Sequence, residues 1–372
     1  MKRHSLLALL FLAISIGITV VSAKSFLKMR QPEPIFPGPG VTEKRMLSDY
    51  FPDLKNSHGD TEVYLLRGKT AGATVLLLGG THPNEPAGFL SALFLIENCA
   101  VDQGQFIIIP RANNSAFTHN DPQEGNPQRF TIHGKNGERW FRFGSRCTNP
   151  VDQWPDPEVY LHYPSGQKLS GSETRNLNRS YPGRPNGAMT EKIAFAIMEL
   201  MKQEQVDLGF DLHEASPEYP VINAVVAHPL ASDLAGEAII NLQMQGLNFN
   251  IEPSPQNFHG LSHREWGDFL NIPAILMESA NTVQGRYHGR LTEDVVLSGK
   301  DRFYHEAAQH GLLEVEYPAE GIPMVERVGR HLAALQTIFQ VWNEYHPGES
   351  IVVQNIPDYF ELQAAGLGAY LN

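Results

Sequence analysis

Two short motifs in the chain carry side chains that bind transition metals. Residues 79–85 read Gly-Gly-Thr-His-Pro-Asn-Glu, so His82 and Glu85 stand three positions apart, directly after an apolar run. In the second motif, Asp-Leu-His-Glu-Ala, His213 ends a strand-like run and Asp211 lies two residues earlier, on the same face of an extended strand. Two histidines and one glutamate form the three-ligand set of a catalytic zinc, which leaves a fourth position for water. The sequence therefore predicts one zinc ion per chain, held by His82, Glu85 and His213.

Two further motifs carry side chains that could act on a substrate beside such a metal. Glu278 follows the apolar run Ile-Leu-Met, where a carboxylate costs free energy unless it is paired or put to use. Next to a metal it could take the proton from an attacking water and so act as the general base. Asn178 and Arg179 stand in a loop that the following Tyr181 and Pro182 stiffen. Because arginine can hold a carboxylate through two parallel hydrogen bonds, this loop predicts a site for a substrate carboxylate.

Each of these side chains also has a simpler interpretation that involves neither metal nor substrate. His82 by itself could be a strand-end histidine bonded to the backbone, and Asp211 could form a cap or a salt bridge as readily as it could orient His213. Glu278 could pair with a structural arginine, and Arg179 could form an ordinary ion pair. The functional interpretation is favoured because all four motifs fall at the ends of predicted strands, where α/β sheets bind their ligands.

Strand-like and helix-like runs alternate through the body of the chain. Residues 61–68 and 73–80 have the composition of strands, residues 86–99 have helical spacing, and residues 104–113 contain a third buried strand. A similar alternation resumes after about residue 181 and continues to about residue 345. This rhythm predicts an α/β fold in which helices cover a sheet.

A long insertion interrupts the alternation at about residues 113–175. It contains a hairpin pattern about Lys135-Asn136-Gly137 and an aromatic, proline-rich stretch without helical spacing. Loops of this length are usually either functional or disordered, and the aromatic side chains argue against disorder. We therefore expect the insertion to lie over one face of the sheet.

The first 23 residues form a separate segment. Lys2 and Arg3 precede an apolar run from Leu6 to Val21, and small residues follow up to Ala23. This is the pattern of a signal peptide that is cut after Ala23. The alternative is an uncleaved membrane anchor, although the run is shorter than the roughly 20 residues that span a bilayer. The sequence predicts an exported protein, periplasmic or extracellular, which contacts a membrane only through this segment if the segment is not cut.

Composition and charge argue against one class of partner and outline the domains. The 372 residues include 41 acidic and 29 basic side chains, a formal net charge of −12, which argues against nucleic-acid binding. Residues 24–58 predict an extended linker because they are rich in proline. Residues 59–346 form the expected catalytic domain, and residues 347–372 a C-terminal extension. Whether Cys99 and Cys147 pair is left open by the sequence.

The order of the motifs resembles the zinc carboxypeptidase superfamily. His-x-x-Glu after two glycines, then Asn-x-Asn-Arg, then a histidine and a glutamate at strand ends follow one another within residues 60–345. The opening Gly-Gly-Thr-His-Pro-Asn-Glu-Pro-Ala-Gly is most similar to the motif of the succinylglutamate desuccinylase/aspartoacylase branch. The resemblance implies an α/β fold with a mixed, twisted eight-stranded sheet between helices. It also implies the following roles: zinc ligands His82, Glu85 and His213, general base Glu278, and substrate-carboxylate residues Asn178 and Arg179.

The resemblance further implies a zinc-dependent hydrolase of an amide bond. The leading hypothesis is an N-acyl amino-acid deacylase whose substrate is a small acyl-amino acid or a peptide. The alternative is an exported metallocarboxypeptidase that acts on peptides or cell-wall peptides, because such peptides are available outside the cell. A hypothesis of another class is a non-catalytic module that binds a peptide or glycan, and Glu278 argues against it because binding alone requires no base.

Some residues of the family pattern have no assigned position. The family uses an arginine to polarise the scissile carbonyl, and the candidates are Arg142, Arg146 and Arg175, with no spacing that decides among them. The insertion is also longer than either branch leads one to expect, so it is expected to reshape the pocket. His259 and His263 lie between the third ligand and the base; they could line the pocket, although bonded loop histidines are the simpler interpretation.

Overall fold

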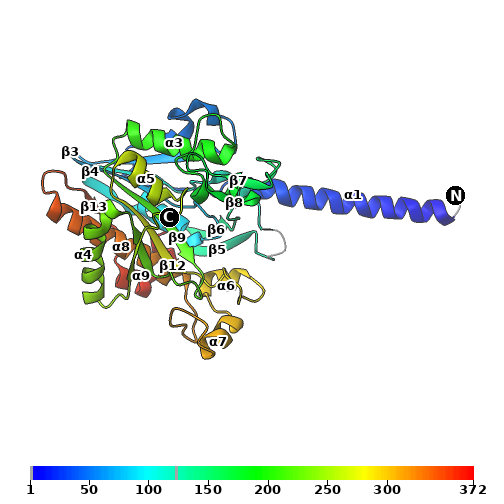
Figure 1. Cartoon of the computed structure of the whole chain (residues 1–372). Coiled ribbons are helices and arrows are strands. Elements are labelled where there is room, and N and C mark those ends of the chain that lie inside the picture. Colours follow the sequence, from blue (N-terminus) through cyan, green and yellow to red (C-terminus); the bar gives the residue numbers. More distant parts are fainter. Residues whose placement is uncertain (1–2, 122–124) are drawn as a thin grey trace.

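The computed structural model describes residues 3–121 and 125–372, and a nine-stranded mixed sheet lies at the centre of this part of the chain (Figure 1). Eight strands form one path: β1 (Glu43–Met46), β2 (Glu62–Arg67), β4 (Ala100–Ile109), β3 (Thr70–Leu78), β9 (Leu208–Ala215), β12 (Ala274–Ala280), β10 (Ala224–Ala227) and β11 (Asn250–Pro253). The ninth, β13 (Val352–Gln354), pairs with the beginning of β4. The predicted α/β class is confirmed. The sheet has nine strands rather than eight because the C-terminal extension adds β13.

The four central strands of the sheet run parallel to one another. β4, β3, β9 and β12 pair in parallel, whereas β2 and β10 run antiparallel to their neighbours β4 and β12. The carboxyl ends of parallel strands lie at the same edge of a sheet, and ligands bind there. This topology brings the loop after β3 and the last residues of β9 and β12 to one place.

Helices cover both faces of the sheet. On one face lie α2 (Pro86–Asn98), α4 (Ser232–Met244), α8 (Met324–Tyr345) and α9 (Tyr359–Ala365), and on the other α3 (Met189–Gln203) and α5 (Ser262–Leu270). Figure 1 shows α3 and α5 above the sheet and α4, α8 and α9 below it. β3 is an example of the resulting burial. Its side chains alternate between the two faces: Val75 and Leu77 pack on the side of α2 and α8. Leu76 and Leu78 pack on the side of α3 and α5. A strand covered on both faces carries an unbroken apolar run, which is why the central strands are visible in the sequence.

The insertion at 113–175 contains two short antiparallel pairs of strands. The first consists of β5 (Arg129–Gly134) and β6 (Gly137–Arg142) and turns at Lys135 and Asn136, as the sequence predicts. The second consists of β7 (Val159–Leu161) and β8 (Lys168–Ser170). Two short helices, α6 (Glu293–Ser298) and α7 (Arg302–Gln309), follow β12.

The N-terminal segment is a single helix, α1 (Arg3–Met29), that extends away from the rest of the molecule (Figure 1). The helix has 27 residues, and its apolar side chains are exposed except for Met29 at its end. By length and composition alone α1 could cross a membrane, but a signal sequence near an N-terminus has the same properties. Both interpretations of this segment therefore remain predictions.

Residues 24–58, expected as an extended linker, contribute to the fold more than their composition indicates. β1 pairs with β2 at the edge of the sheet, and Met29 is buried. Glu33 is also buried and forms ion pairs with Arg111 and Arg142. A proline-rich composition does not reveal these contacts because each of them is made with a distant part of the chain.

Candidate metal centre

All six predicted site residues line one cavity of about 670 Å³. The cavity opens at the carboxyl ends of the parallel strands. It is lined by the candidate ligands His82, Glu85 and His213, the candidate base Glu278, and the candidate substrate residues Asn178 and Arg179. The structure thus brings together residues that the sequence places up to 196 positions apart, although their roles remain proposals.

The two glycines after β3 allow the chain to turn sharply into the cavity. Gly80 has φ of +66°, and a Cβ at this position would lie 2.7 Å from the ring of Phe117. A side chain would therefore be strained as well as crowded there. The turn continues with a hydrogen bond of 2.9 Å from the Glu85 amide to the His82 carbonyl, and α2 begins at Pro86. Proline suits the first turn of a helix, so the motif fixes both side chains between a strand and a helix.

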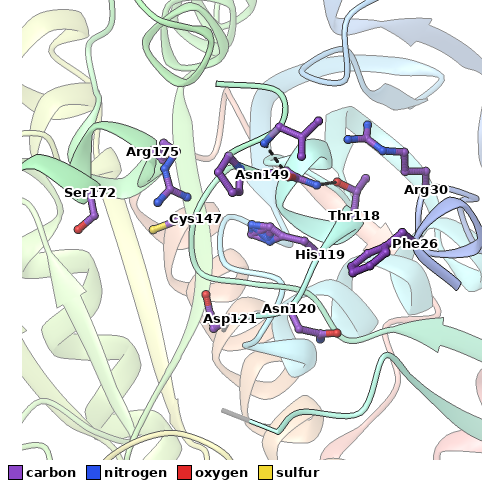
Figure 2. A pocket seen from close by; sticks show the side chains of 12 residues that line it. Phe26, Arg30, Thr118, His119, Asn120, Asp121, Cys147, Asn149, Ser172 and Arg175 are labelled. Atoms are coloured by element: carbon purple, nitrogen blue, oxygen red, sulfur yellow. Dashed lines mark hydrogen bonds between the residues drawn. The ribbon is translucent and has the colours of Figure 1, made fainter. Parts of the chain in front are cut away.

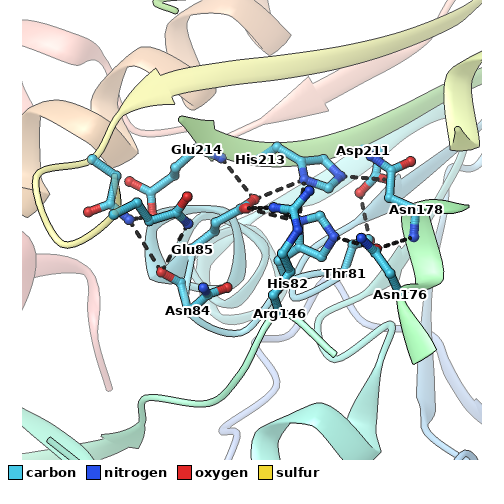
Figure 3. A network of polar contacts seen from close by, with 12 residues as sticks. Thr81, His82, Asn84, Glu85, Arg146, Asn176, Asn178, Asp211, His213 and Glu214 are labelled. Carbon is cyan, nitrogen blue, oxygen red and sulfur yellow. Dashed lines mark hydrogen bonds and ion pairs between the residues drawn. The ribbon is translucent and has the colours of Figure 1, made fainter. Parts of the chain in front are cut away.

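The three candidate ligands converge on one point (Figure 3). Glu85 Oε1 lies 2.8 Å from His82 Nδ1, and Glu85 Oε2 lies 2.9 Å from His213 Nδ1. The two Nδ1 atoms are 3.1 Å apart, and all three side chains are buried.

A second set of residues fixes the orientation of both imidazole rings (Figure 3). His82 Nε2 lies 2.9 Å from Asn176 Oδ1, and His213 Nε2 lies 3.0 Å from Asp211 Oδ2. Asn176 Oδ1 only accepts hydrogen bonds, so His82 Nε2 carries a proton and donates it, which leaves a lone pair on His82 Nδ1. The carboxylate of Asp211 favours a proton on His213 Nε2, and the Nδ1 atoms of both rings face each other beside the Glu85 carboxylate. Ring nitrogens that face each other beside a buried carboxylate form an arrangement that a cation stabilises, and a partner that fixes the far nitrogen is typical of metal-bound histidine. The residues present therefore fit a divalent metal, and Asp211 has the orienting position that was one of its two interpretations.

The charges at this centre depend on one another. Burial and the nearby Arg146 guanidinium lower the pKa of His82 to about 4. Burial opposes ionisation of Glu85, but His82 and His213 outweigh it and hold the pKa of this carboxyl well below its usual range. Burial would also lower the pKa of His213, yet the carboxylates of Asp211 and Glu85 raise it well above its ordinary value. Glu85 is therefore an anion, as a metal ligand must be.

Glu278 lies directly beside His213 on the neighbouring strand. The two residues are register partners in the parallel pair formed by β9 and β12. Among the described residues, Glu278 Oε2 has no hydrogen-bond partner, and burial raises the pKa of this carboxyl to about 8. A carboxylate of raised pKa next to a metal site is a stronger base than an ordinary glutamate. The alternative of a structural arginine partner for Glu278 has no counterpart among the described contacts.

Of the three candidate arginines, only Arg146 reaches the centre. Its Nη1 lies 3.2 Å from Glu85 Oε1 and 3.3 Å from His82 Nδ1. Arg142 is buried elsewhere and holds Glu33 through two hydrogen bonds. Arg175 holds Asp156 in the same way. These paired arginines are structural, which leaves Arg146 as the candidate to polarise a carbonyl.

Asn178 and Arg179 form the cationic wall of the cavity. Ser262 donates its amide to Asn178 Oδ1 over 2.8 Å, which directs the amide nitrogen of Asn178 to the cavity. Burial and the positive charge of Arg146 lower the pKa of Arg179 to about 10. The nearest ion-pair partner of Arg179 is Glu173, at 3.8 Å. A guanidinium group whose countercharge lies this far away suits a substrate carboxylate.

The two candidate histidines of the following loop differ in their surroundings. His259 Nδ1 lies 3.1 Å from Glu265 Oε1, so it is the bonded loop histidine that the sequence favoured. His263 instead lines the cavity while buried, and neither of its ring nitrogens has a partner among the described residues. Burial lowers the pKa of His263 to about 3, so its ring is neutral.

Asn176, which orients His82, is not among the predicted site residues, although it is the first asparagine of the same Arg-Asn-Leu-Asn-Arg run. A separate cavity of about 620 Å³ lies where α1 meets the insertion, and Figure 2 shows its lining. Phe26, Cys147 and Arg175 are among the residues that line it.

Cys147 and the buried Cys99 are both free thiols in the structure, so the two cysteines do not pair.

Comparisons with known proteins agree with the motifs. No family model matches the chain. A curated relative, the N-alpha-acetyl-L-2,4-diaminobutyric acid deacetylase of Halomonas elongata, is 27% identical over 161 residues, which are 43% of this chain and 33% of the relative. The chain therefore spans about a third of the length of this relative.

Two solved structures are also similar. A succinylglutamate desuccinylase/aspartoacylase of Rhodobacter sphaeroides is 19% identical with a TM-score of 0.38, and the match covers 61% of this chain and 54% of the other. A metallocarboxypeptidase of Burkholderia cenocepacia is 12% identical with a TM-score of 0.46, and the match covers 86% and 68%. The resemblance indicated by the motifs is confirmed: the chain is similar to proteins of the succinylglutamate desuccinylase/aspartoacylase branch and, at lower identity, to metallocarboxypeptidases.

Proposed function

We propose that the chain is a zinc-dependent hydrolase that cleaves an amide bond next to a carboxylate-bearing group, as an N-acyl amino-acid deacylase does. The observation that carries the proposal is the convergence of His82, Glu85 and His213 in a cavity that also holds Glu278, whose Oε2 has no hydrogen-bond partner in the described part of the chain. The cavity volume of about 670 Å³ lies in the usual range for small-molecule sites. The name of the curated relative, a deacetylase, supports the same class of reaction.

The residues around the centre would each have a distinct role in amide hydrolysis. A bound zinc supplies a Lewis acid that polarises a carbonyl and acidifies water. Glu278 takes the proton of the attacking water and returns it to the leaving amine. Arg146 donates hydrogen bonds to the oxygen on which negative charge develops. Asn178 and Arg179 hold the substrate carboxylate and so align the amide with these groups.

An exported metallocarboxypeptidase that acts on peptides or cell-wall peptides is a second candidate. α1 supports it, because a chain that carries an export signal meets peptides outside the cytoplasm. A panel of N-acetyl and N-succinyl amino acids beside dipeptides and tripeptides with free carboxyl ends separates the two. The deacylase hypothesis expects cleavage of the N-acyl amino acids only, and the carboxypeptidase hypothesis expects cleavage of the dipeptides and tripeptides with release of their C-terminal amino acid.

Metal content is the first prediction. Protein purified without chelators or a histidine tag should hold about one zinc per chain, as elemental mass spectrometry would measure. His82→Ala should lose it, because two of the three ligands do not hold zinc in the usual tetrahedral geometry. His310→Ala, which changes an exposed histidine directly after the end of α7, should keep it. Absence of metal from the unaltered protein after incubation with zinc would remove the hydrolytic mechanism and favour the binding-module hypothesis.

Export is the second prediction. The expected mature protein is found outside the cytoplasm and begins at Lys24, after a cut behind Ala23. The contacts that join the end of α1 to the body begin at Ser25, whose hydroxyl bonds Gln128, so the cut leaves them intact. Intact-mass analysis of the protein from fractionated cells tests this. A membrane-bound chain that retains residues 1–23 would show that α1 is an anchor, and an uncut chain in the cytosol would contradict export altogether.

A further inference from the structure

Glu252 is a carboxylate in the same cavity that the proposed mechanism does not use. It belongs to β11, the last strand of the sheet, and is partly buried. Among the described residues it forms neither a hydrogen bond nor an ion pair, although it lines the cavity together with Glu278 and Arg179. A carboxylate that lines a substrate cavity without a partner is a feature that a substrate cation could satisfy.

The register of the sheet fixes the position of Glu252 relative to the catalytic centre. Leu276 on β12, Val226 on β10 and Glu252 on β11 are successive register partners. All three line the cavity, so they form one row across its floor. Glu278 lies two residues beyond Leu276 on β12, on the same face of the strand.

The usual spacings within a β-sheet give the distance between Glu252 and Glu278. Glu252 is two strands away from Glu278 and two residues along, which places their Cα atoms about 12 Å apart by the usual spacings. The floor between them consists of the apolar side chains of Leu276 and Val226. A substrate that reaches Glu252 therefore needs an aliphatic stem of several carbons between its scissile amide and its terminal group.

The two ends of the cavity therefore carry side chains of opposite charge. Arg146 and Arg179 lie near the candidate metal ligands, at distances short enough for Arg146 to contact Glu85 and to lower the pKa of Arg179. Glu252 lies on the outermost strand, beyond the apolar floor. An amino acid whose α-carboxylate binds the arginines would extend its side chain along the floor and end at a negative charge.

We infer that the cavity selects N-acyl amino acids whose side chain is an unbranched aliphatic stem that ends in an ammonium or guanidinium group, with Glu252 as the partner of that cation. The inference deepens the proposed deacylase function and rests on it for the position of the amide. Glu252 is then a specificity-determining residue that touches the substrate but not the reacting atoms.

The test compares substrates that differ only in the terminal charge. Nα-acetyl-lysine and Nα-acetyl-norleucine share the stem, and the corresponding Nα-succinyl compounds cover a larger acyl group. The zinc-loaded protein should favour the lysine compound by about tenfold or more in kcat/KM, since a hydrogen-bonded charge pair of this kind is worth at least that factor. Glu252→Gln should remove the preference by raising KM for the lysine compound, with kcat and the norleucine compound unchanged.

Two further variants sharpen the test. Glu252→Lys should favour Nα-acetyl-glutamate over Nα-acetyl-lysine, because it reverses the charge at the end of the floor. Glu344→Gln, an identical change at an exposed position on α8, should leave all values unchanged. Equal rates for the lysine and norleucine compounds in the unaltered protein would overturn the inference while the hydrolase function stands.

Failure of the proposed function gives a different result. If the zinc-loaded protein hydrolyses none of these compounds, the deacylase proposal falls. Calorimetric titration with free lysine and free norleucine then tests Glu252 alone. Tighter binding of lysine that disappears in Glu252→Gln supports the cation site, and equal binding of the two amino acids overturns it.

Discussion

Glu278→Gln should lower kcat for amide hydrolysis by about 10²- to 10⁴-fold while the protein keeps its zinc. The change preserves the shape of the side chain but replaces the carboxylate with an amide, which is too weak a base to take the proton of water. Glu278 is not one of the three converging ligands, so the metal content should remain about one per chain. The substrate should bind with little change in KM, because the change leaves Asn178 and Arg179, the residues proposed to hold its carboxylate, unaltered.

This variant also separates an enzyme from a binding module. A module that only binds ligand would be indifferent to the loss of a base, whereas a hydrolase would bind and not turn over. Elemental analysis, ligand titration and a rate assay on the same preparation give the three values needed. Glu344→Gln, on the surface of α8, is the matched control. Hydrolysis that survives in Glu278→Gln at the original rate would show that another group is the base.

Glu33→Gln should reduce the free energy of unfolding by about 3–5 kcal/mol. Glu33 is buried between two arginines: its Oε1 lies 3.1 Å from Arg111 Nη1, and its Oε2 lies 2.6 Å from Arg142 Nε. Arg142 is itself fully buried. Removal of the anion leaves the buried Arg142 without a countercharge, although Arg111 keeps Glu62 at 2.6 Å. An uncompensated buried charge costs far more than the loss of an exposed pair. Denaturant unfolding of the purified protein measures the difference.

Two comparisons check the physical reason for this loss. Glu43→Gln alters a half-exposed glutamate that pairs with Arg45 and Arg67, and it should cost less than about 1 kcal/mol. The second comparison is with pH. Burial opposes ionisation of Glu33, but Arg142 and Arg111 outweigh it and lower the pKa of this carboxyl from 4.5 to about 2.

The sign of the pH dependence follows from that lowered pKa. The folded state holds the Glu33 anion more strongly than the unfolded state, so its contribution is complete above about pH 4.5 and is lost as the pH falls toward 2. The difference between the unaltered protein and Glu33→Gln should shrink over the same range, because protonated glutamate and glutamine are both neutral. A difference that stays constant down to pH 2 would assign the loss to packing rather than to charge.

The sequence predicts the central elements of the fold because burial on both faces leaves a strong signal. β3 and β4 end in the runs Val-Leu-Leu-Leu and Phe-Ile-Ile-Ile, and both follow directly from composition. The edge strands β1, β11 and β13 are three or four residues long and partly exposed, so neither length nor apolar pattern distinguishes them from loops. Their pairing depends on a neighbour that is already in place.

The residues of the candidate site also divide into those that the sequence predicts and those that depend on tertiary contacts. His82, Glu85, His213 and Glu278 are predictable because each one lies at or just after the end of an apolar strand, where α/β sheets bind ligands. Arg146 is different, since it reaches the centre from an insertion whose path is set by tertiary contacts. Nothing in the spacing of Arg142, Arg146 and Arg175 decides among them, and only their partners in the folded chain tell them apart.

The placement of Glu252 has a consequence for how the protein can diverge. Three of the four residues of β11 are exposed, whereas every residue of β9, which carries His213, is buried. Surface substitutions usually change stability by no more than about 0.5 kcal/mol, and truncation of core side chains costs about 2–5 kcal/mol. A descendant lineage could therefore replace the terminal group that the cavity accepts by a single substitution on the outermost strand. The residues proposed for hydrolysis would be inherited unchanged, while the substrate specificity changes.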